Sequence, residues 1–318
     1  MKVVIDTDTA GDDTISILLA LKWPGVDVLG LTIVAGNVEF SHEVKNALYM
    51  VEKFASKPIP VYPGARRPLL KDWEYADYVH GKDGMSDHGW RPERLKPQDK
   101  HGAQALVELA REHPGEITLV AQGPLTNVAL AMMLDPEFPD NLRELVIMGG
   151  YAQGYGNITP VAEYNFWVDP DAAKMVFRHW PRERKPLVVG WDITLKHALV
   201  YEHEHMQIAQ WGTPEAEFFV KVNQKPMEFE KKTFGIPAST HPDAITMAIA
   251  IDKRVAKRVE ERYVDVEERE GPTRGMFIVD HAGVLGEKPN ARVVYEADGE
   301  LFKKMLFSVL RGRPGEVD

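Results

Sequence analysis

Apolar runs and amphipathic segments alternate along the first part of the chain. The runs are short, rich in β-branched residues and apolar throughout, which is typical of strands buried on both faces of a mostly parallel sheet. The segments between them have the apolar periodicity of helices that cover such a sheet. We expect strands at 2–6, 28–34, 58–64, 116–123, 144–150 and 186–192. We expect helices at 12–23, 41–55, 101–113, 124–134 and 169–180.

The pattern changes in the last third of the chain, where it becomes more helical, then turns to strands and ends in a helix. No internal repeat or linker separates this part from the rest, so we read it as an addition to one core. The fold class that we expect is α/β, with residues 1–318 forming a single domain. The additional helices are expected at 215–232, 242–252 and 300–311, and the additional strands at 262–268, 276–280 and 291–297.

The segment from about 65 to 100 interrupts the alternation. It has few periodic apolar positions and contains the polar stretch HGKDGMSDHG. Loops of that length are usually functional or disordered. We therefore expect a flexible flap near a ligand site.

Composition limits the classes of function. With 318 residues, 44% of them hydrophobic, the chain can bury a large core. It has no cysteine and its start enters a strand directly, so we expect a cytoplasmic protein without disulfide or thiolate chemistry. No apolar stretch approaches the ~18 residues of a membrane span. A formal charge of −10 argues against a nucleic-acid partner, whose binding depends on Lys and Arg, and favours a small neutral or cationic ligand.

Four aspartates crowd the junction between the first expected strand and helix, in the stretch DTDTAGDD. Asp6 and Asp8 end the strand, and Asp12 and Asp13 open the helix. Helix capping explains one or two of them. Four like charges so close together repel one another unless a cation is present, and hard dications such as Ca²⁺ or Mg²⁺ are held by carboxylate and carbonyl oxygens. We favour a metal site over capping alone.

Polar residues follow the other expected strands as well, and ligands of such folds bind at the carboxyl ends of the strands. Asn37 follows the second strand in AGN, and QGPLTN follows the fourth. In GNITPVAEYN, the side chains of Asn157, Glu163 and Asn165 suit the vicinal hydroxyls of a sugar, although such residues are also common in turns. Asp243 opens a later helix, where a metal-ligand role and a simple N-terminal carboxylate both remain open.

The motifs DTDTAGDD, AGN, QGPLTN, MGG and GNITPVAEYN, and a late Asp before an apolar helix, resemble in order and spacing those of the calcium-dependent nucleoside hydrolases. This family is also called the inosine-uridine preferring nucleoside N-ribohydrolases, and the resemblance covers about residues 2–253. It implies one domain with a Rossmann-like sheet and a single Ca²⁺. It also implies hydrolysis of the N-glycosidic bond of ribonucleosides by a Ca²⁺-bound water that an aspartate activates. The partner would be a small nucleoside, and we expect a homo-oligomer, either a dimer or a tetramer.

The resemblance also implies roles for individual residues. The reaction passes through an oxocarbenium-like state, which nearby anionic oxygens stabilise. Asp8 is our candidate for the base that takes the proton of the attacking water. By position, the metal ligands are Asp8, Asp13, Asp243 and the main-chain carbonyl of Thr126. The implied ribose-binding set is Asp12, Asn37, Asn157, Glu163 and Asn165.

The chain departs from the family where the departing base would receive a proton. Many members read His-Asp-Pro, with the His as the acid, whereas this chain reads His241-Pro242-Asp243. His241 is one residue early, so a structural or capping role competes with catalysis. His80, on the flap, resembles a second family histidine near the base and is otherwise a solvated loop residue. The aromatic residues that we consider for stacking on the base, or for the core, are Phe166, Trp167 and Trp191.

Two other classes of function remain as alternatives. DTDT after a strand also matches haloacid-dehalogenase-type phosphatases, which use Mg²⁺, but this reading leaves Asn37 and the 157–165 cluster unused. A non-catalytic nucleoside-binding or ribose-binding protein would keep the amides and lose the acidic cluster. Release of ribose, set against release of phosphate from p-nitrophenyl phosphate, distinguishes these alternatives.

Overall fold

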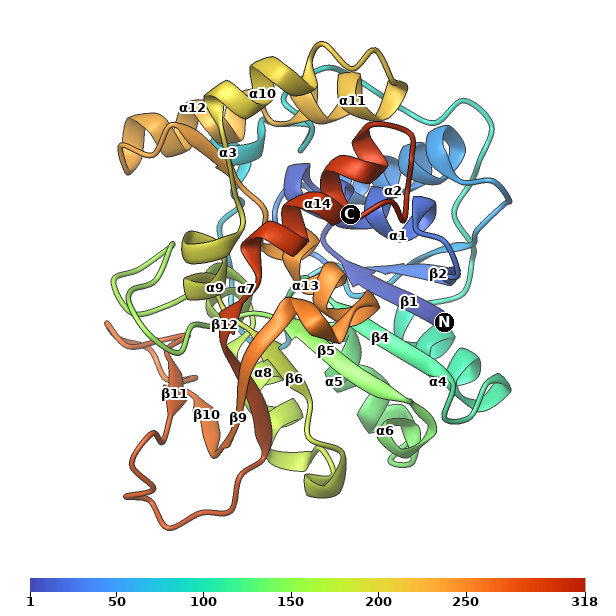
Figure 1. The fold of residues 1–318 in the computed structure, drawn as a ribbon. Coiled ribbons are helices and arrows are strands. Elements are labelled where there is room, and N and C mark those ends of the chain that lie inside the picture. The colour runs from blue at the N-terminus through green and yellow to red at the C-terminus, as the bar shows by residue number, and fades with distance from the viewer. Residues whose placement is uncertain (318) are drawn as a thin grey trace.

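The computed structural model describes residues 1–317, and its centre is an eight-stranded sheet (Figure 1). The strand order is β3-β2-β1-β4-β5-β6-β12-β9. Neighbouring strands are parallel except β12 and β9, which confirms the mostly parallel sheet expected from the apolar runs. The strands are β1 (Lys2–Thr7), β2 (Asp27–Ile33), β3 (Val61–Pro63), β4 (Ile117–Ala121), β5 (Glu144–Met148), β6 (Leu187–Val189), β9 (Ala256–Arg262) and β12 (Ala291–Ala297).

Helices cover both faces of the sheet. Successive side chains of β1 alternate between two hydrophobic clusters, since Val3 and Ile5 belong to one cluster and Val4 to the other. The first cluster includes residues of α1 (Gly11–Lys22), α2 (Phe40–Phe54), α13 (Pro242–Ile251) and α14 (Gly299–Leu310). The second includes residues of α4 (Gly102–Glu112), α5 (Thr126–Leu134) and α8 (Pro170–His179). Burial on both faces explains why the strands read as continuous apolar runs.

The remaining elements lie around this core. Two small antiparallel sheets pair β7 (Leu199–Tyr201) with β8 (Ala238–Thr240), and β10 (Val264–Val266) with β11 (Phe277–Val279). The other helices are α3 (Asp77–His80), α6 (Phe138–Asn141), α7 (Tyr164–Val168), α9 (Trp191–His197), α10 (Glu202–Ile208), α11 (Pro214–Val222) and α12 (Gln224–Thr233). Two 3₁₀ turns lie at Arg182–Arg184 and Lys253–Val255.

The single helix expected at 215–232 is instead two helices, α11 and α12. Pro226 has no main-chain N–H and cannot donate to the carbonyl of Val222 four residues earlier. That carbonyl accepts a hydrogen bond from the Ser86 hydroxyl, at 2.7 Å. Ser86 of the flap therefore donates to the Val222 carbonyl the hydrogen bond that Pro226 cannot donate.

The last third of the chain contributes to the main sheet as well as to its surroundings. β12 pairs with β6, and β9 forms the edge beyond it. The strand expected at 262–268 contains β10 (Val264–Val266), whereas β9, which ends at Arg262, lies almost entirely before it. We missed most of β9 because its residues alternate between half-buried and exposed, so no apolar run marks this edge strand.

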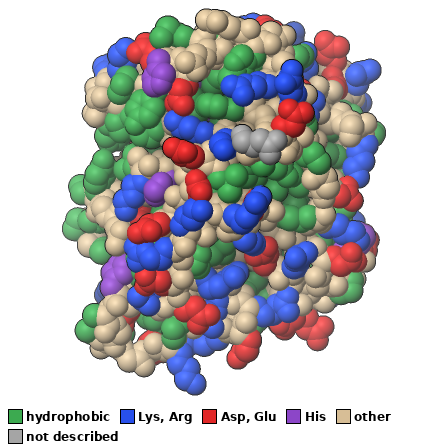
Figure 2. Space-filling view, viewed as in Figure 1, with side chains coloured by type: hydrophobic (Ala, Val, Ile, Leu, Met, Phe, Trp, Pro, Cys, Tyr) green, Lys and Arg blue, Asp and Glu red, His purple; other side chains and the backbone are tan. Residues whose placement is uncertain are grey.

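The flap contains one helical turn, α3, which lies beside α12 (Figure 1). His88 Nε2 is 3.1 Å from the Lys221 carbonyl, and Lys225 pairs with Asp87, so the flap is bonded to both α11 and α12. Within residues 1–317, no helix is both long and apolar enough to cross a membrane. On the face shown in Figure 2, basic and acidic side chains are interspersed rather than separated into fields of one sign.

Candidate active site

The acidic motif lies where β1 gives way to α1. Asp8 follows the last residue of β1, and Asp12 and Asp13 lie in the first turn of α1. The N-terminus of α13 brings Asp243 to the same place because α13 packs on α1. Carboxylate oxygens of Asp12, Asp13 and Asp243 lie within 4.8 Å of one another, close enough to share one cation.

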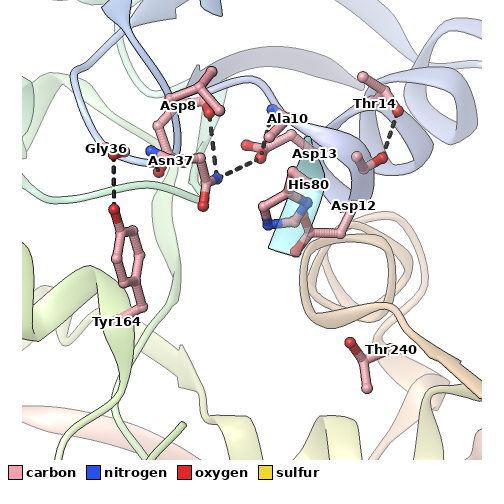
Figure 3. Close-up of polar contacts among 12 residues, drawn as sticks. Asp8, Ala10, Asp12, Asp13, Thr14, Gly36, Asn37, His80, Tyr164 and Thr240 are labelled. Atoms are coloured by element: carbon pink, nitrogen blue, oxygen red, sulfur yellow. Dashed lines mark hydrogen bonds and ion pairs between the residues drawn. The ribbon is translucent and has the colours of Figure 1, made fainter. Parts of the chain in front are cut away.

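Hydrogen bonds fix the orientation of the carboxylates of Asp13, a member of this group, and of Asp8 beside it (Figure 3). Asp13 accepts from the Thr7 hydroxyl at 2.6 Å, from the main-chain N–H of Ala10 at 3.0 Å and from the Asn37 amide at 3.2 Å. Asp8 Oδ2 accepts from the main-chain N–H of Asn37 at 3.0 Å. Asp8 Oδ1 is buried without a partner. The cluster thus retains acceptor capacity that the protein does not satisfy.

The electrostatics of the cluster call for a cation. Burial raises the pKa of Asp8 well above its usual range, and the charges of Asp13, Glu43 and Asp12 raise it further. Burial and the charges of Asp12, Asp13 and Asp8 raise the pKa of Asp243 in the same way. The pKa of Asp13 rises to about 7 and that of Asp12 to about 6, chiefly through burial. A bound dication would offset this repulsion and favour the ionised carboxylates.

A pocket opens in front of the cluster, and polar and aromatic side chains from several parts of the chain line it. The five residues predicted to bind ribose all line it, although they come from three separate segments of the chain. They are Asp12, Asn37, Asn157, Glu163 and Asn165.

Local bonds orient the 157–165 segment along the pocket wall. Glu163 caps α7 and accepts from the main-chain N–H groups of Asn165 and Gly150, both at 2.8 Å. Burial raises the pKa of Glu163 to about 7. The Asn165 amide donates to the main-chain carbonyls of Gln122 and Met148, both at 3.3 Å. The segment is therefore tied to the ends of β4 and β5.

Of the four predicted metal ligands, Asp243 lines the pocket, whereas Asp8, Asp13 and Thr126 do not. Thr126 is the first residue of α5, and its hydroxyl donates to Asp169 at 2.7 Å, so the role of its main-chain carbonyl stays a prediction. Gln122, four residues earlier in the same motif, lines the pocket and donates to Asp13 at 3.1 Å. Gln122 directly follows β4, so the rule that sites form at strand ends could have identified it.

The two histidines lie in different places. His80 lines the pocket, and its Nε2 is 3.8 Å from Asp12 Oδ1 (Figure 3). Burial lowers the pKa of His80 to about 4, so the ring is neutral near pH 7. His241 is fully buried and does not line the pocket, because its Nε2 bonds to Ser239 Oγ at 2.7 Å and its ring stacks on Phe219. This placement argues against His241 as the acid.

Of the aromatic residues considered for stacking, Trp191 lines the pocket, whereas Phe166 packs in the core against Phe177 and Phe277. Trp167 packs against the guanidinium of Arg274 and does not line the pocket. The pocket also contains residues of α3 and α12 and nearby positions that the sequence did not single out, namely Tyr78, Pro226, Phe229, Glu230, Phe234 and Thr240.

The sequence profile described as "Inosine-uridine preferring nucleoside hydrolase" matches residues 3–304. The chain belongs to this family. A relative in Escherichia coli (strain SE11), named pyrimidine-specific ribonucleoside hydrolase RihB, is 32% identical over 98% of this chain and 97% of its own length. The solved plant nucleoside hydrolase PpNRh1 superposes with a TM-score of 0.90 at 30% identity over 98% of both chains. A purine-preferring ribonucleoside hydrolase from Gardnerella vaginalis gives a TM-score of 0.90 at 26% identity, covering 98% of this chain and 99% of its own.

Family membership establishes that the chain is a nucleoside hydrolase. Its reaction is the hydrolysis of an N-glycosyl bond, and its substrate is a nucleoside. Family membership confirms the resemblance seen in the motifs, and it does not favour the phosphatase alternative. The names of the relatives differ in the base that they mention, pyrimidine for one and purine for another. The family alone therefore leaves the base preference of this chain open.

Replacement of the buried histidine is expected to have a small effect on catalysis. We expect His241→Ala to lower kcat by less than about tenfold, against the ~10²–10⁴-fold expected for a lost acid. The reason is that the imidazole contacts Ser239 and Phe219 rather than the pocket. Steady-state kinetics with inosine and with p-nitrophenyl riboside check this, and a large loss confined to inosine would restore His241 as the acid.

Proposed function

We propose that this chain is a calcium-dependent ribonucleoside hydrolase in which Asp8 accepts the proton of the attacking water. The observation that carries the proposal is the acidic cluster of Asp8, Asp12, Asp13 and Asp243 beside a pocket lined by amides that suit ribose hydroxyls. A panel of inosine, adenosine, guanosine, uridine and cytidine, assayed for reducing sugar, tests it. Release of ribose from none of the five would overturn it.

The residues of the cluster fit Ca²⁺. All of them offer oxygen, and buried oxygens of Asp8 and Asp12 have no hydrogen-bond partner. We assign Asp8, Asp13, Asp243 and the main-chain carbonyl of Thr126 as ligands, as the resemblance implies, and leave Asp12, which lines the pocket, for the ribose. A bound Ca²⁺ would acidify the attacking water and neutralise the cluster.

Side chains of the pocket and the cluster then bind the ribose, stabilise its developing charge and accept the proton of water. Asn37, Asn157 and Asn165 donate to and accept from the ribose hydroxyls and fix the anomeric carbon in front of Asp8. The anionic oxygens beneath the sugar stabilise the positive charge that develops on it as the bond to the base breaks. Asp8 takes one proton from water, whose oxygen bonds to the anomeric carbon.

Removal of calcium is expected to abolish activity. Elemental analysis of the purified protein should find about one calcium per chain, because the ligands are oxygens and the protein has no cysteine. Asp13→Asn should retain little calcium, whereas Asp140→Asn, on the exposed face of α6, should retain it. Stoichiometric zinc, or full activity of metal-free protein, would contradict the assignment.

We further propose that residues 1–318 act as one domain, with the flap as its mobile part, and that the chain works in the cytoplasm as a homodimer or homotetramer. Support for one domain comes from β12 and β9, which share a sheet with β1. Sedimentation velocity tests the oligomeric state. A monomer across micromolar concentrations would count against it.

A further inference from the structure

α12 buries a carboxylic acid. Only Pro226 and Glu230 of this helix are buried, and the Glu230 residue is 4% exposed. Glu230 Oε1 accepts from the Thr240 hydroxyl at 3.3 Å, whereas Oε2 is buried with no hydrogen-bond partner. Buried polar atoms are normally paired, so an unpaired oxygen on a pocket wall indicates a partner that arrives with the ligand.

The position of Glu230 indicates which part of the ligand it meets. In the proposed function, Asn37, Asn165 and the acidic cluster take the ribose. Glu230 comes instead from α12, where Phe229 of the same helix also lines the pocket and packs against Tyr78 of α3. Aromatic rings and a carboxyl group suit a flat, polar nucleobase. Glu230 therefore faces the space that the base occupies when the ribose lies on the cluster.

Glu230 carries a proton in part of the molecules near neutral pH. Burial raises the pKa of Glu230 to about 7. The hydrogen bond from Thr240 lowers this pKa, and the charge of Asp12 raises it. His80 and Tyr78 on α3 and Asp243 on α13 are the other titratable groups of the pocket wall near these elements. The lysine next in sequence, Lys231, pairs with Glu202 outside the pocket. A pKa near the working pH is suited to general acid catalysis.

The other candidates for proton donor are less suitable. His80 is neutral because burial lowers its pKa to about 4, and His241 faces Ser239. Glu163 has both oxygens engaged by main-chain N–H groups, those of Gly150, Asn165 and Phe166. Glu230 alone among these residues combines a free oxygen with a proton at neutral pH.

We infer that Glu230 is the general acid that protonates the departing nucleobase. The proton leaves Glu230 Oε2 and bonds to a ring nitrogen or carbonyl oxygen of the base, while the electron pair of the bond to the anomeric carbon moves onto the base. Water supplies the hydroxyl of the ribose, and its proton goes to Asp8. Proton exchange with solvent restores both side chains. The inference rests on the proposed function and adds the group that lets the base leave.

The test compares Glu230→Gln with Glu228→Gln, which makes the same charge change on the exposed side of α12. Both variants and the wild type are assayed on inosine, on uridine and on p-nitrophenyl riboside, whose leaving group needs no proton. We expect Glu230→Gln to lose ~10²–10⁴-fold in kcat on both nucleosides and less than about tenfold on p-nitrophenyl riboside. Glu228→Gln should match the wild type on all three substrates.

The pH profile provides a second readout. The wild-type kcat on inosine should fall above about pH 7 as Glu230 ionises, and Glu230→Gln should lack this fall. Equal losses on nucleosides and p-nitrophenyl riboside would overturn the inference, because they indicate a role in binding or folding. A wild type inactive on all three substrates would overturn the proposed function itself, a result distinct from failure of the acid alone.

Discussion

Asp8→Asn should lower kcat by ~10²–10⁴-fold on every substrate, including p-nitrophenyl riboside. In the proposed mechanism, the substitution removes the base and weakens the metal site, both of which act whatever the leaving group. The fold should persist, because the asparagine oxygen can still accept from the main-chain N–H of Asn37. The melting temperature of the metal-free protein should rise, since the substitution relieves repulsion from Asp13, Glu43 and Asp12.

Asp6→Asn is the matched control. Asp6 is equally buried and lies in β1, two residues before Asp8, but its carboxylate accepts from Thr32 and Asn127 instead of facing the other carboxylates of the cluster. This variant should keep kcat within about tenfold of the wild type. An Asp8→Asn enzyme with more than about a tenth of the wild-type rate would exclude Asp8 as the base.

Gly36→Ala should lower kcat by about 10²-fold without removing any functional group. A Cβ at this position would overlap the Asp8 carboxylate, so the carboxylate must move. Displacement of a reacting group by about 1 Å can cost this much. Steady-state kinetics on inosine, with a calcium measurement on the same sample, check the prediction.

Gly30→Ala, on β2, controls for the loss of a glycine. Its Cβ would lie 3.1 Å from the ring of Tyr62, a partly exposed side chain that can turn aside. We expect wild-type kcat for this variant. If Gly36→Ala also kept the wild-type rate, the Asp8 carboxylate would not need the position seen in the structure.

The site residues at the strand ends were predictable because the apolar pattern and the rule for ligand sites in parallel sheets point to the same residues. The apolar runs locate β1 and β2, and the rule for parallel sheets then brings Asp8 and Asn37 to one edge. The role of the Thr126 carbonyl rests on the motif alone, because a motif gives the order of residues but not the point at which the chain turns into α5. Oxygens of Asp12, Asp13 and Asp243 lie close together in the structure, whereas the motif assigned Asp12 to the ribose.

The base end of the pocket was not predictable in the same way. Glu230 stands in the charged stretch EFEKK, where its sequence neighbours resemble a solvated helix face. Its burial depends on the break at Asn223, between α11 and α12, and on the packing of α12 against α3 and β8, which are contacts between distant segments. The same holds for His241, whose direction depends on Ser239 and Phe219.

The cluster joins the start of the polypeptide to its last third, because Asp13 lies in α1 and Asp243 in α13. During synthesis the N-terminal carboxylates leave the ribosome long before Asp243. Until α13 docks on α1, the proposed calcium site has only part of its ligand set. A cation that binds the complete set stabilises the finished fold and not the partial ones. Calcium in the growth medium would then act on the yield of folded enzyme as well as on its rate.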